Sequence, residues 1–376
     1  MTDERRARMG LAATHDPGDV GFSALIQEKG AIAIWDYLRS GRGTTTIARR
    51  AQQVDITDVL RQTDKLGARF LIPGDDEWPA SLADLGWSQP VGDNGGVPVG
   101  LWAIGPADLG NLGASVAIVG SRASTAYGEH VAADWAVGLA ERGHVVVSGG
   151  AYGIDACAHR GALAAGGTTV AVMAGGLGQL YPTGNIQLLK RVEQVGVVVS
   201  ENPPWSPPNR GRFLVRNRLI AALSSATLIV EGALRSGAQN TVSWALSLGR
   251  PVMAAPGPVT SAMSVTPHRL IRNGEAVLVT GVDDILALVE PLKSSVPDFQ
   301  RDQPILFDDL TVQQKLVHDA IPSRKSVSVD ELSLVTGESA LTLLVALAQL
   351  KQVGLVVETH PGLWRAAPLS RISAKR

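Results

Sequence analysis

The chain of 376 residues carries 34 basic and 35 acidic side chains, which gives a formal net charge of -1 at pH 7. Such a balance excludes nonspecific attraction of the whole protein to nucleic acid or to an acidic membrane, so any polyanion must bind to a local patch. With 45% hydrophobic residues and 41 glycines, a chain of this length favours a packed α/β protein of two or three domains.

The sequence also limits the cell compartment. A single cysteine, Cys157, excludes an internal disulfide framework. No apolar run reaches the roughly 18 residues that a membrane span needs, and residues 1–6 are not followed by the apolar stretch of a signal peptide. We therefore expect a reduced, cytoplasmic protein without a membrane partner.

Short helical patterns occupy the first part of the chain. They cover residues 22–28, 31–38, 47–50 and 58–66, with Gly30 between the first two. We predict a small helical domain over residues 1–75. The glycine- and proline-rich stretch that follows, residues 89–98, predicts a surface loop of the central domain.

In the middle of the chain, short β-branched runs alternate with helical patterns. Continuous apolar runs separated by helices indicate strands that are buried on both faces, and hence a parallel sheet with right-handed crossovers. We predict an α/β fold with a Rossmann-like parallel sheet over residues 76–292. Its expected strands are residues 116–119, 145–147, 169–173, 197–199, 227–230, 251–254 and 277–279.

The last part of the chain follows a linker, residues 291–304, which is polar and flanked by prolines. Three helical patterns and two short apolar runs then predict a winged helix-turn-helix over residues 305–370. Its presumed recognition helix, residues 340–351, has one basic residue. Reading of duplex DNA needs more polar and cationic groups than this, so we expect a protein contact or a structural role.

A cluster of arginines is the most informative local feature. Residues 209–219 contain four of them, and no acidic residue lies between Glu201 and Glu231. Because the planar guanidinium group suits phosphate oxygens, this spacing predicts an anion site at one end of a helix.

Helical periodicity divides these arginines between two sides. Arg212 and Arg216 lie one turn apart on one face, whereas Arg218 lies on another. We therefore expect either Arg216 or Arg218 to pair with Glu201 or Glu231 inside the domain.

Three loops at the carboxyl ends of predicted strands are rich in small and polar residues. Ligands of open parallel sheets bind at this edge, where free N–H groups of helix N-termini favour anions. Glycines there allow close approach by a phosphate-bearing ligand. The loops are residues 120–122, 148–155 and 231–237.

Other kinds of site lack their signatures. The sequence has no P-loop, no Gly-x-Gly-x-x-Gly after the first predicted strand, and no paired Cys or His spacing typical of a metal site. Cys157 and His159 are two residues apart on a predicted helix and point to different sides, so we interpret Cys157 as a small core residue and His159 as a helix-capping or packing residue. We expect a binding protein without cofactor or metal, not an enzyme.

Taken together, these motifs resemble the DprA/Smf family of DNA-processing proteins. The resemblance covers most of the chain and implies a SAM-like N-terminal domain, a homodimer, and binding of single-stranded DNA during natural transformation. It further implies that the protein protects incoming strands, displaces single-strand-binding protein and loads the RecA recombinase. It is carried by residues 116–122, 127–128, 148–155, 158–159, 181–182, Asn185, 200–201, Phe213, 216–218, 236–237 and 256–257.

The resemblance also implies site residues. Thr183 stands where many relatives have lysine, which removes one phosphate contact or transfers it to Lys190 or Arg191. Residues 266–275, beside the expected dimer surface, also depart from the family pattern. The candidate DNA-binding residues are Gly120, Ser121, Arg122, Ser148, Gly149, Gly150, Arg210, Arg212, Phe213, Arg216, Asn217, Arg218, Arg235, Ser236 and Gly237.

In the resulting hypothesis a single strand crosses the sheet edge with its phosphates on these arginines. Trp205 and Phe213 either stack one base each or pack within the domain. The alternative is a Rossmann-like nucleotide phosphoribohydrolase, but residues 232–241 lack the carboxylate that its catalytic loop requires. An RNA partner stays open, because no residue here reads a 2′-hydroxyl.

Overall fold

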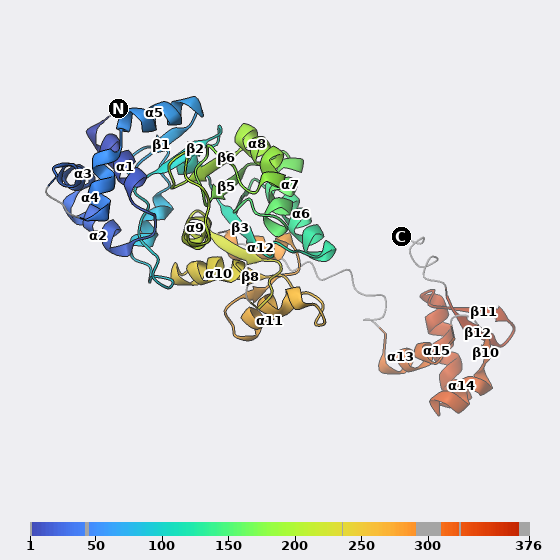
Figure 1. The fold of residues 1–376 in the computed structure, drawn as a ribbon. Coiled ribbons are helices and arrows are strands. Elements are labelled where there is room, and N and C mark those ends of the chain that lie inside the picture. Colours follow the sequence, from blue (N-terminus) through green and yellow to red (C-terminus); the bar gives the residue numbers. More distant parts are fainter. Residues whose placement is uncertain (1, 42–44, 235, 291–309, 323–324, 368–376) are drawn as a thin grey trace. The chain divides into compact units, whose positions relative to one another are not determined.

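The computed structural model describes residues 2–41, 45–234, 236–290, 310–322 and 325–367 (Figure 1). The chain forms two compact units, Met1–Leu292 and Lys293–Arg376. Arg235 and the whole of the predicted linker, residues 291–304, lie outside the described residues.

Five helices open the first unit. Thr2, Asp19, Thr45 and Asp55 each precede a helix, and each side chain accepts an N–H from its first turn, which explains where four of these helices begin. The five are α1 (Asp3–Thr14), α2 (Val20–Lys29), α3 (Ala31–Arg39), α4 (Thr46–Gln53) and α5 (Ile56–Lys65).

The sequence patterns predict α2 to α5 but not α1. That helix is rich in charge, and its arginines find partners far along the chain. Arg5 forms an ion pair of 2.6 Å with Asp75, and Arg8 donates to the carbonyl oxygen of Val99 at 3.0 Å. Tertiary contacts therefore stabilise α1, and local periodicity does not reveal them.

A nine-stranded sheet forms the centre of this unit, in the order β1-β2-β6-β5-β4-β3-β7-β8-β9. The strands from β3 to β9 are parallel and confirm the seven predicted runs. They are β3 (Ser115–Val119), β4 (Val145–Ser148), β5 (Thr169–Met173), β6 (Val197–Ser200), β7 (Ala226–Ile229), β8 (Val252–Ala254) and β9 (Val277–Leu278).

Two further strands extend the sheet at one edge, and the sequence did not predict them. β2 (Leu101–Ile104) runs antiparallel to β6, and β1 (Arg69–Leu71) runs antiparallel to β2. Since β1 lies before residue 75, part of the predicted helical domain belongs to the central sheet. Met9 of α1 and Val59 of α5 share a core cluster with Trp102 of β2.

Helices cover both faces of the sheet. Val116 and Ile118 of β3 pack with α6 (Ala126–Glu141) and α7 (Ile154–Ala164), whereas Ala117 and Val119 pack with α9 (Arg210–Ala222) and α10 (Ala238–Ser247). This alternation follows from the two-residue period of a strand that is buried on both sides. The other helices and 3-10 turns are η1 (Ala80–Gly86), η2 (Leu109–Asn111), η3 (Thr183–Asn185), α8 (Ile186–Val195), η4 (Ala262–Ser264), α11 (Val265–Arg272) and α12 (Val282–Val289).

The strand order reverses at β3. From β3 the chain proceeds through β4, β5 and β6 on one side, then returns to form β7, β8 and β9 on the other. Open α/β sheets bind ligands at such a reversal, outside the carboxyl ends of the strands. The fold therefore points to the loops that follow β3 and β7.

The second unit contains a helical core and a small antiparallel sheet in the order β10-β12-β11. Within it α14 and α15 are joined by three residues, among them Gly337 at φ 73°, and are bent by 107°, as in helix-turn-helix motifs. The winged-helix assignment remains a prediction. The elements are α13 (Val312–Asp319), β10 (Val327–Ser328), α14 (Val329–Thr336), α15 (Ala340–Gln352), β11 (Val356–His360) and β12 (Leu363–Ala366).

Within the described ranges, no single helix is long and apolar enough to cross a bilayer. The α14–α15 pair meets the length and composition limits only when both helices are counted together across their bend.

Candidate nucleic-acid interface

A cleft of about 830 Å³ opens where the strand order reverses. The turn after β3, the start of α9 and the start of α10 line it, which brings together three segments that are far apart in the sequence. Its lining includes these predicted residues: Gly120, Ser121, Arg122, Arg210, Phe213, Arg216, Asn217, Ser236 and Gly237.

The start of α9 is fixed by its own residues. The side chain of Asn209 accepts the N–H of Arg212 at 2.9 Å and so caps the helix, immediately after Pro207 and Pro208. Farther along, Val215 and Leu219 are buried. The helix therefore packs with its apolar residues and presents its first turn to the cleft.

Arg216 lies at the floor of the cleft and is almost fully buried. It donates to the carbonyl oxygen of Gly149 at 2.8 Å and to that of Val172. Burial lowers the pKa of Arg216 to about 10, although the nearby Asp155 carboxylate counteracts this effect. The guanidinium group is thus charged at neutral pH and held in one orientation.

Among the described residues that line this cleft, Asp155 is the one acidic residue. Burial raises the pKa of its carboxyl group, against the opposing effects of Arg216 and of the Ala151 and Gly149 N–H groups. Since Asp155 accepts from these backbone groups at 3.4 and 3.2 Å, it fixes the turn after β4 beneath the cleft.

The rim of the cleft combines a cation with aromatic rings. The guanidinium carbon of Arg122 lies 4.5 Å from the centroid of the Phe213 ring, and Tyr181 meets the same ring edge-on at 6.0 Å. Arg122 is exposed, as is Arg210. No ion pair with a carboxylate is found for either arginine in the part of the chain that the structure describes. Both are therefore available to an anion.

One expected anion site is already occupied by the protein itself. At the N-terminus of α6, the Glu231 carboxylate accepts from the Thr125 N–H at 2.9 Å and from the Thr125 hydroxyl at 2.5 Å. The free N–H groups of this helix end are thus partly satisfied by a protein carboxylate, contrary to the expectation that they attract phosphate. The turn after β3 contributes the Arg122 side chain instead.

Ser121 forms hydrogen bonds within the same turn. Its N–H donates to the Glu231 carbonyl oxygen at 2.9 Å, and its hydroxyl accepts the Ala123 N–H at 3.1 Å. The side chain is mostly buried. It stabilises the turn that positions Arg122.

Ser148, Gly149 and Gly150 do not line the cleft, contrary to the sequence expectation. The Ser148 hydroxyl is fully buried and donates to the Ile118 carbonyl oxygen at 2.7 Å. A Cβ on Gly149 would lie 2.5 Å from Nη2 of Arg216. These residues lie beneath the cleft and make room for Arg216.

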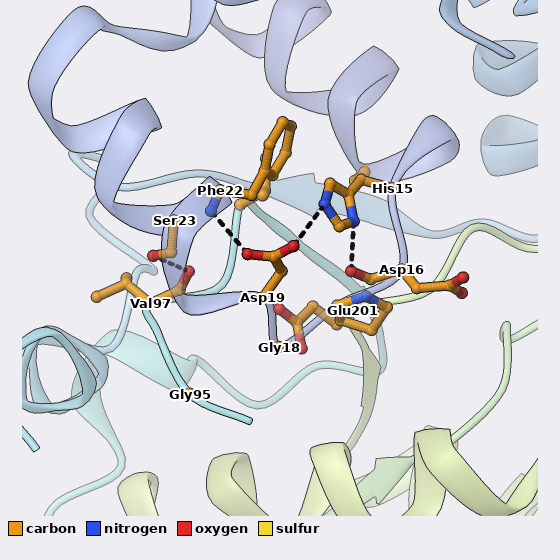
Figure 2. Close-up of a pocket in the computed structure, with 12 residues that line it drawn as sticks. His15, Asp16, Gly18, Asp19, Phe22, Ser23, Gly95, Val97 and Glu201 are labelled. Atoms are coloured by element: carbon orange, nitrogen blue, oxygen red, sulfur yellow. Dashed lines mark hydrogen bonds and ion pairs between the residues drawn. The ribbon is translucent and has the colours of Figure 1, made fainter. Parts of the chain in front are cut away.

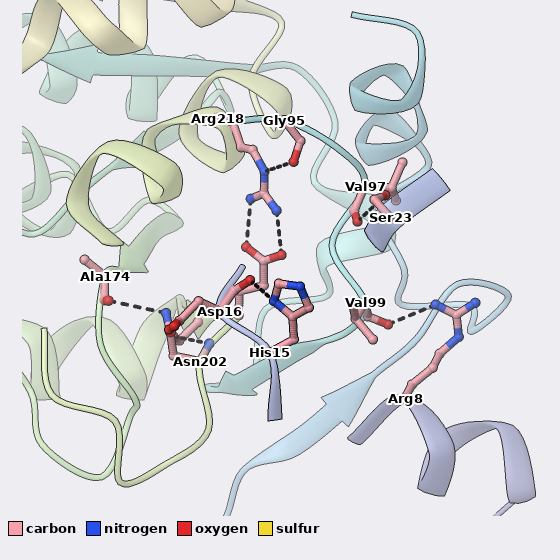
Figure 3. Close-up of polar contacts among 12 residues, drawn as sticks. Arg8, His15, Asp16, Ser23, Gly95, Val97, Val99, Ala174, Asn202 and Arg218 are labelled. Atoms are coloured by element: carbon pink, nitrogen blue, oxygen red, sulfur yellow. Dashed lines mark hydrogen bonds and ion pairs between the residues drawn. The ribbon is translucent and has the colours of Figure 1, made fainter. Parts of the chain in front are cut away.

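Arg218 points away from the cleft, which corrects its assignment as a DNA contact. Its guanidinium is 1% exposed and binds the Glu201 carboxylate through two hydrogen bonds of 2.7 and 2.5 Å. A third donor reaches the Gly95 carbonyl oxygen at 3.4 Å (Figure 3). The expected internal ion pair of one helix arginine is confirmed here, and it occupies Arg218.

Arg212 is also absent from the cleft lining. It forms an ion pair of 2.8 Å with Asp16 and donates to the Pro207 carbonyl oxygen at 2.8 Å. The basic cluster of the sequence therefore separates into cleft residues, Arg210 and Arg216, and internally bound ones, Arg212 and Arg218.

The segment between α1 and α2 braces α9, a relationship that the sequence did not indicate. In Figure 2 the His15 ring lies between Asp16 and Asp19, and its Nδ1 is 2.7 Å from the Asp16 carbonyl oxygen. Gly18, at φ +91°, packs so closely on α9 that a Cβ there would lie 2.6 Å from Val215. The N-terminal helices thus help to hold the helix that carries Arg216.

Two aromatic residues differ from expectation in whether they line the cleft. Trp205, a candidate for base stacking, is 44% exposed but does not line the cleft. Tyr181 does line it, although only its place in the family motif pointed to it. Asn240 and Met263 also line the cleft, and no sequence signal marked them.

Among the described residues, the structure shows neither a thiol–imidazole pair nor a metal cluster at the cleft. His159 is fully buried, and its Nδ1 lies 2.8 Å from the Thr169 hydroxyl, which itself donates to the Val146 carbonyl oxygen. Burial, followed by the charge of Arg216, lowers the pKa of His159 to about 3. Among the residues that the structure describes, no group of three or more His, Cys, Asp or Glu residues is placed to hold a metal ion.

Comparison with known proteins places these features in a family. Residues 69–290 match the family model described as DNA recombination-mediator protein A. The chain is 43% identical over 367 residues to the putative DNA processing protein DprA of Mycobacterium tuberculosis, an alignment that covers 96% of this chain and 94% of that protein.

Two solved structures are also similar. DNA processing protein A from Streptococcus pneumoniae is 30% identical with a TM-score of 0.65, and the match covers 77% of this chain and 99% of that one. DNA processing protein A from Helicobacter pylori, whose structure is described for its single-stranded DNA binding mode, is 27% identical with a TM-score of 0.51 over 58% of this chain and 94% of that one.

Proposed function

This chain belongs to the family of DNA recombination-mediator protein A, and we propose that it binds single-stranded DNA in the cleft at the carboxyl edge of its sheet. The observation that carries the proposal is the pairing of Arg122 with Phe213 at the rim, above the buried charge of Arg216. A guanidinium group beside an aromatic face offers both contacts that an unpaired nucleotide needs, one for its phosphate and one for its base. The H. pylori relative that binds single-stranded DNA supports the same ligand class.

The composition of the cleft supports DNA binding over catalysis. The single carboxylate among its described residues, Asp155, is buried among backbone N–H groups and beside Arg216, so it has no free position from which to attack or protonate a substrate. We propose that the protein does not hydrolyse nucleotides. Release of free base from nucleoside monophosphates, in proportion to protein concentration, would contradict this.

Binding in the cleft can be tested with a fluorescent oligothymidylate whose anisotropy is followed during titration. The proposal predicts that Arg122→Ala and Phe213→Leu each weaken binding, whereas Arg49→Ala, which removes an exposed arginine of α4, leaves it unchanged. Equal affinities for all four proteins would place the DNA elsewhere.

We further propose that the bound strand is transferred to RecA and that single-strand-binding protein is displaced. The description of the matched family as a recombination mediator supports this role. The test is assembly of RecA on a single strand that single-strand-binding protein already coats. Addition of this protein should shorten the lag before RecA filaments form, and the Arg122→Ala variant should shorten it less.

We also propose that the chain forms a homodimer through the free edge of its sheet. β9 is the last strand on that side, and Val277 and Leu278 are half exposed there. An apolar strand edge of this kind pairs readily with another surface. Replacement of both residues by lysine should lower the molar mass that light scattering measures to that of one chain.

A further inference from the structure

Tyr152 is a half-exposed aromatic residue in the turn after β4, beside the cleft but not part of its lining. The residue is 46% exposed. It belongs to none of the hydrophobic core clusters among the described residues, so packing into a core does not account for its place. Its neighbour in the chain, Ala151, lines the cleft. The ring therefore lies at the border of the site that we propose for single-stranded DNA.

The turn that carries Tyr152 packs directly against the turn that carries Arg122. The N–H of Ile154 donates to the carbonyl oxygen of Ser121 at 3.2 Å. Gly153, at φ +73°, approaches so closely that a Cβ there would clash with the Ser121 carbonyl oxygen and lie 2.9 Å from that of Arg122. The backbone at Tyr152 is therefore held beside the turn that positions the cation of the cleft rim.

On its other side Tyr152 is joined to the loop that begins with Tyr181. The Tyr152 hydroxyl accepts the N–H of Gly184 at 3.2 Å, and a Cβ on Gly184 would lie 2.8 Å from that hydroxyl. Asn185 is 2% exposed, and its side-chain amide donates to two carbonyl oxygens of the turn after β4 at 3.0 Å each. These contacts hold two half-exposed tyrosines on neighbouring loops, the first at the border of the cleft and the second in its lining.

The stretch of chain that carries both tyrosines has no exposed carboxylate. Within residues 142–192 the only acidic residue is Asp155, which is buried. This stretch therefore does not repel the phosphates of a strand that extends beyond the cleft. Every base has a π face, so an exposed ring beside a phosphate contact can stack a base of any sequence.

We propose that Tyr152 stacks a base outside the cleft and so extends the strand-binding site toward the start of α8. The strand leaves the cleft over Tyr181, and the next base along the path stacks on Tyr152. This inference rests on the proposed binding of single-stranded DNA in the cleft. It predicts that a strand longer than the cleft gains affinity, whatever its sequence.

A length series tests the extension in the full-length protein. Fluorescent oligothymidylates of about 4 to about 16 nucleotides cover the site sizes of known single-strand-binding folds. Y152L should bind the longer strands on the order of tenfold more weakly than the wild type, and the shortest strands equally well. Y152F keeps the ring and should bind all lengths as the wild type does. Y37L removes an exposed ring of α3 and is the matched control without an effect at any length.

Stacking itself is read with 2-aminopurine, a fluorescent base that stacking quenches, placed at each position of a long strand in turn. Near one end of the strand the wild type and Y152F should quench a position that Y152L leaves bright. An identical quenching pattern for all three proteins would overturn the inference.

The affinities separate this inference from the function on which it rests. Y152L with wild-type affinity at every length would overturn the role of Tyr152, and so would a loss by the same factor at every length, because the ring would then brace the cleft. Y152F as weak as Y152L would also overturn it, since the hydroxyl and not the ring would matter. If R122A instead leaves the affinity for the shortest strand unchanged, the cleft itself is not the binding site.

Discussion

Arg218 and Glu201 form a buried ion pair outside the cleft lining, with two hydrogen bonds of 2.7 and 2.5 Å between guanidinium and carboxylate. Both side chains are nearly inaccessible to solvent. The pair joins α9 to the end of β6, and the Gly95 carbonyl oxygen accepts from the same arginine. It therefore stabilises the helix that presents Arg210 and Arg216 without itself reaching a ligand.

Arg218→Ala should lower the free energy of unfolding by about 3–5 kcal/mol, because Glu201 is left as an unpaired buried charge. Urea unfolding followed by circular dichroism measures this. The joint Arg218→Met, Glu201→Gln protein should recover part of the loss. Arg218→Ala protein that retains wild-type stability but loses strand affinity would show that the arginine acts on DNA directly.

Arg122→Ala should weaken binding of every single-stranded sequence alike, by about tenfold for one charged contact. The slope of log affinity against log salt should decrease by about 0.7, the value for one phosphate contact on a single strand. Titrations at four salt concentrations give both quantities. Arg49→Ala is the matched control, and an unchanged slope for Arg122→Ala would remove this residue from the phosphate path.

Phe213→Leu should cost about 1–3 kcal/mol of binding free energy if the ring stacks on a base. Because no charge is removed, the salt slope should stay as in the wild type. Phe213→Tyr keeps an aromatic face and should bind nearly normally. If leucine and tyrosine at this position weaken binding equally, the ring packs within the domain and does not stack.

Asp16→Asn should strengthen strand binding. The ion pair of 2.8 Å with Asp16 holds Arg212 outside the cleft lining, and its loss frees a cation beside Arg210. The salt slope should then rise by up to about 0.7. Asp58→Asn, which breaks the exposed pair with Arg61 on α5, is the control and should have no effect. Weaker binding by Asp16→Asn would mean that Asp16 supports the site.

The buried imidazole of His159 should make the free energy of unfolding depend on pH. Its pKa is about 3 in the folded protein, below the ordinary value of 6.5, so the unfolded chain binds the proton more readily and stability falls as pH drops below 6.5. Between pH 6.5 and pH 5 the loss should be about 2 kcal/mol, and His159→Gln should lack it. Burial raises the pKa of Asp155, so this residue changes the stability with pH in the opposite direction. Both proteins contain Asp155, and the difference between their stability curves therefore reports on His159 alone. Parallel stability curves would contradict the assignment.

The sequence predicts much of the fold because the parallel strands are buried on both faces. Runs such as residues 197–199 are continuous and β-branched, and neighbouring helices have clear periodicity. β1 and β2 escaped prediction since they are antiparallel and stand outside the alternation of strands and α-helices. Helix α1 escaped because its charged residues, Arg5 among them, find partners that only the tertiary structure supplies.

The sequence predicted where the candidate site lies, but not which side chains contact one another there. Helical spacing places Arg216 and Arg218 on different faces of α9. This spacing predicted that one of them forms an internal ion pair with a glutamate. The choice of Glu201 depends on how β6 and α9 meet in space. That Asp16 binds Arg212, and that Glu231 occupies the N-terminus of α6, depends on contacts across more than 100 residues, which local patterns do not encode.

The most direct test of the account compares one labelled single strand with a duplex of the same sequence, each titrated at several salt concentrations. Tight binding of the single strand, with a salt slope that falls in Arg122→Ala and Arg216→Ala, and much weaker binding of the duplex are the expected results. Equal affinity for single strand and duplex, or a slope that neither substitution alters, would contradict the proposal that this cleft holds unpaired DNA.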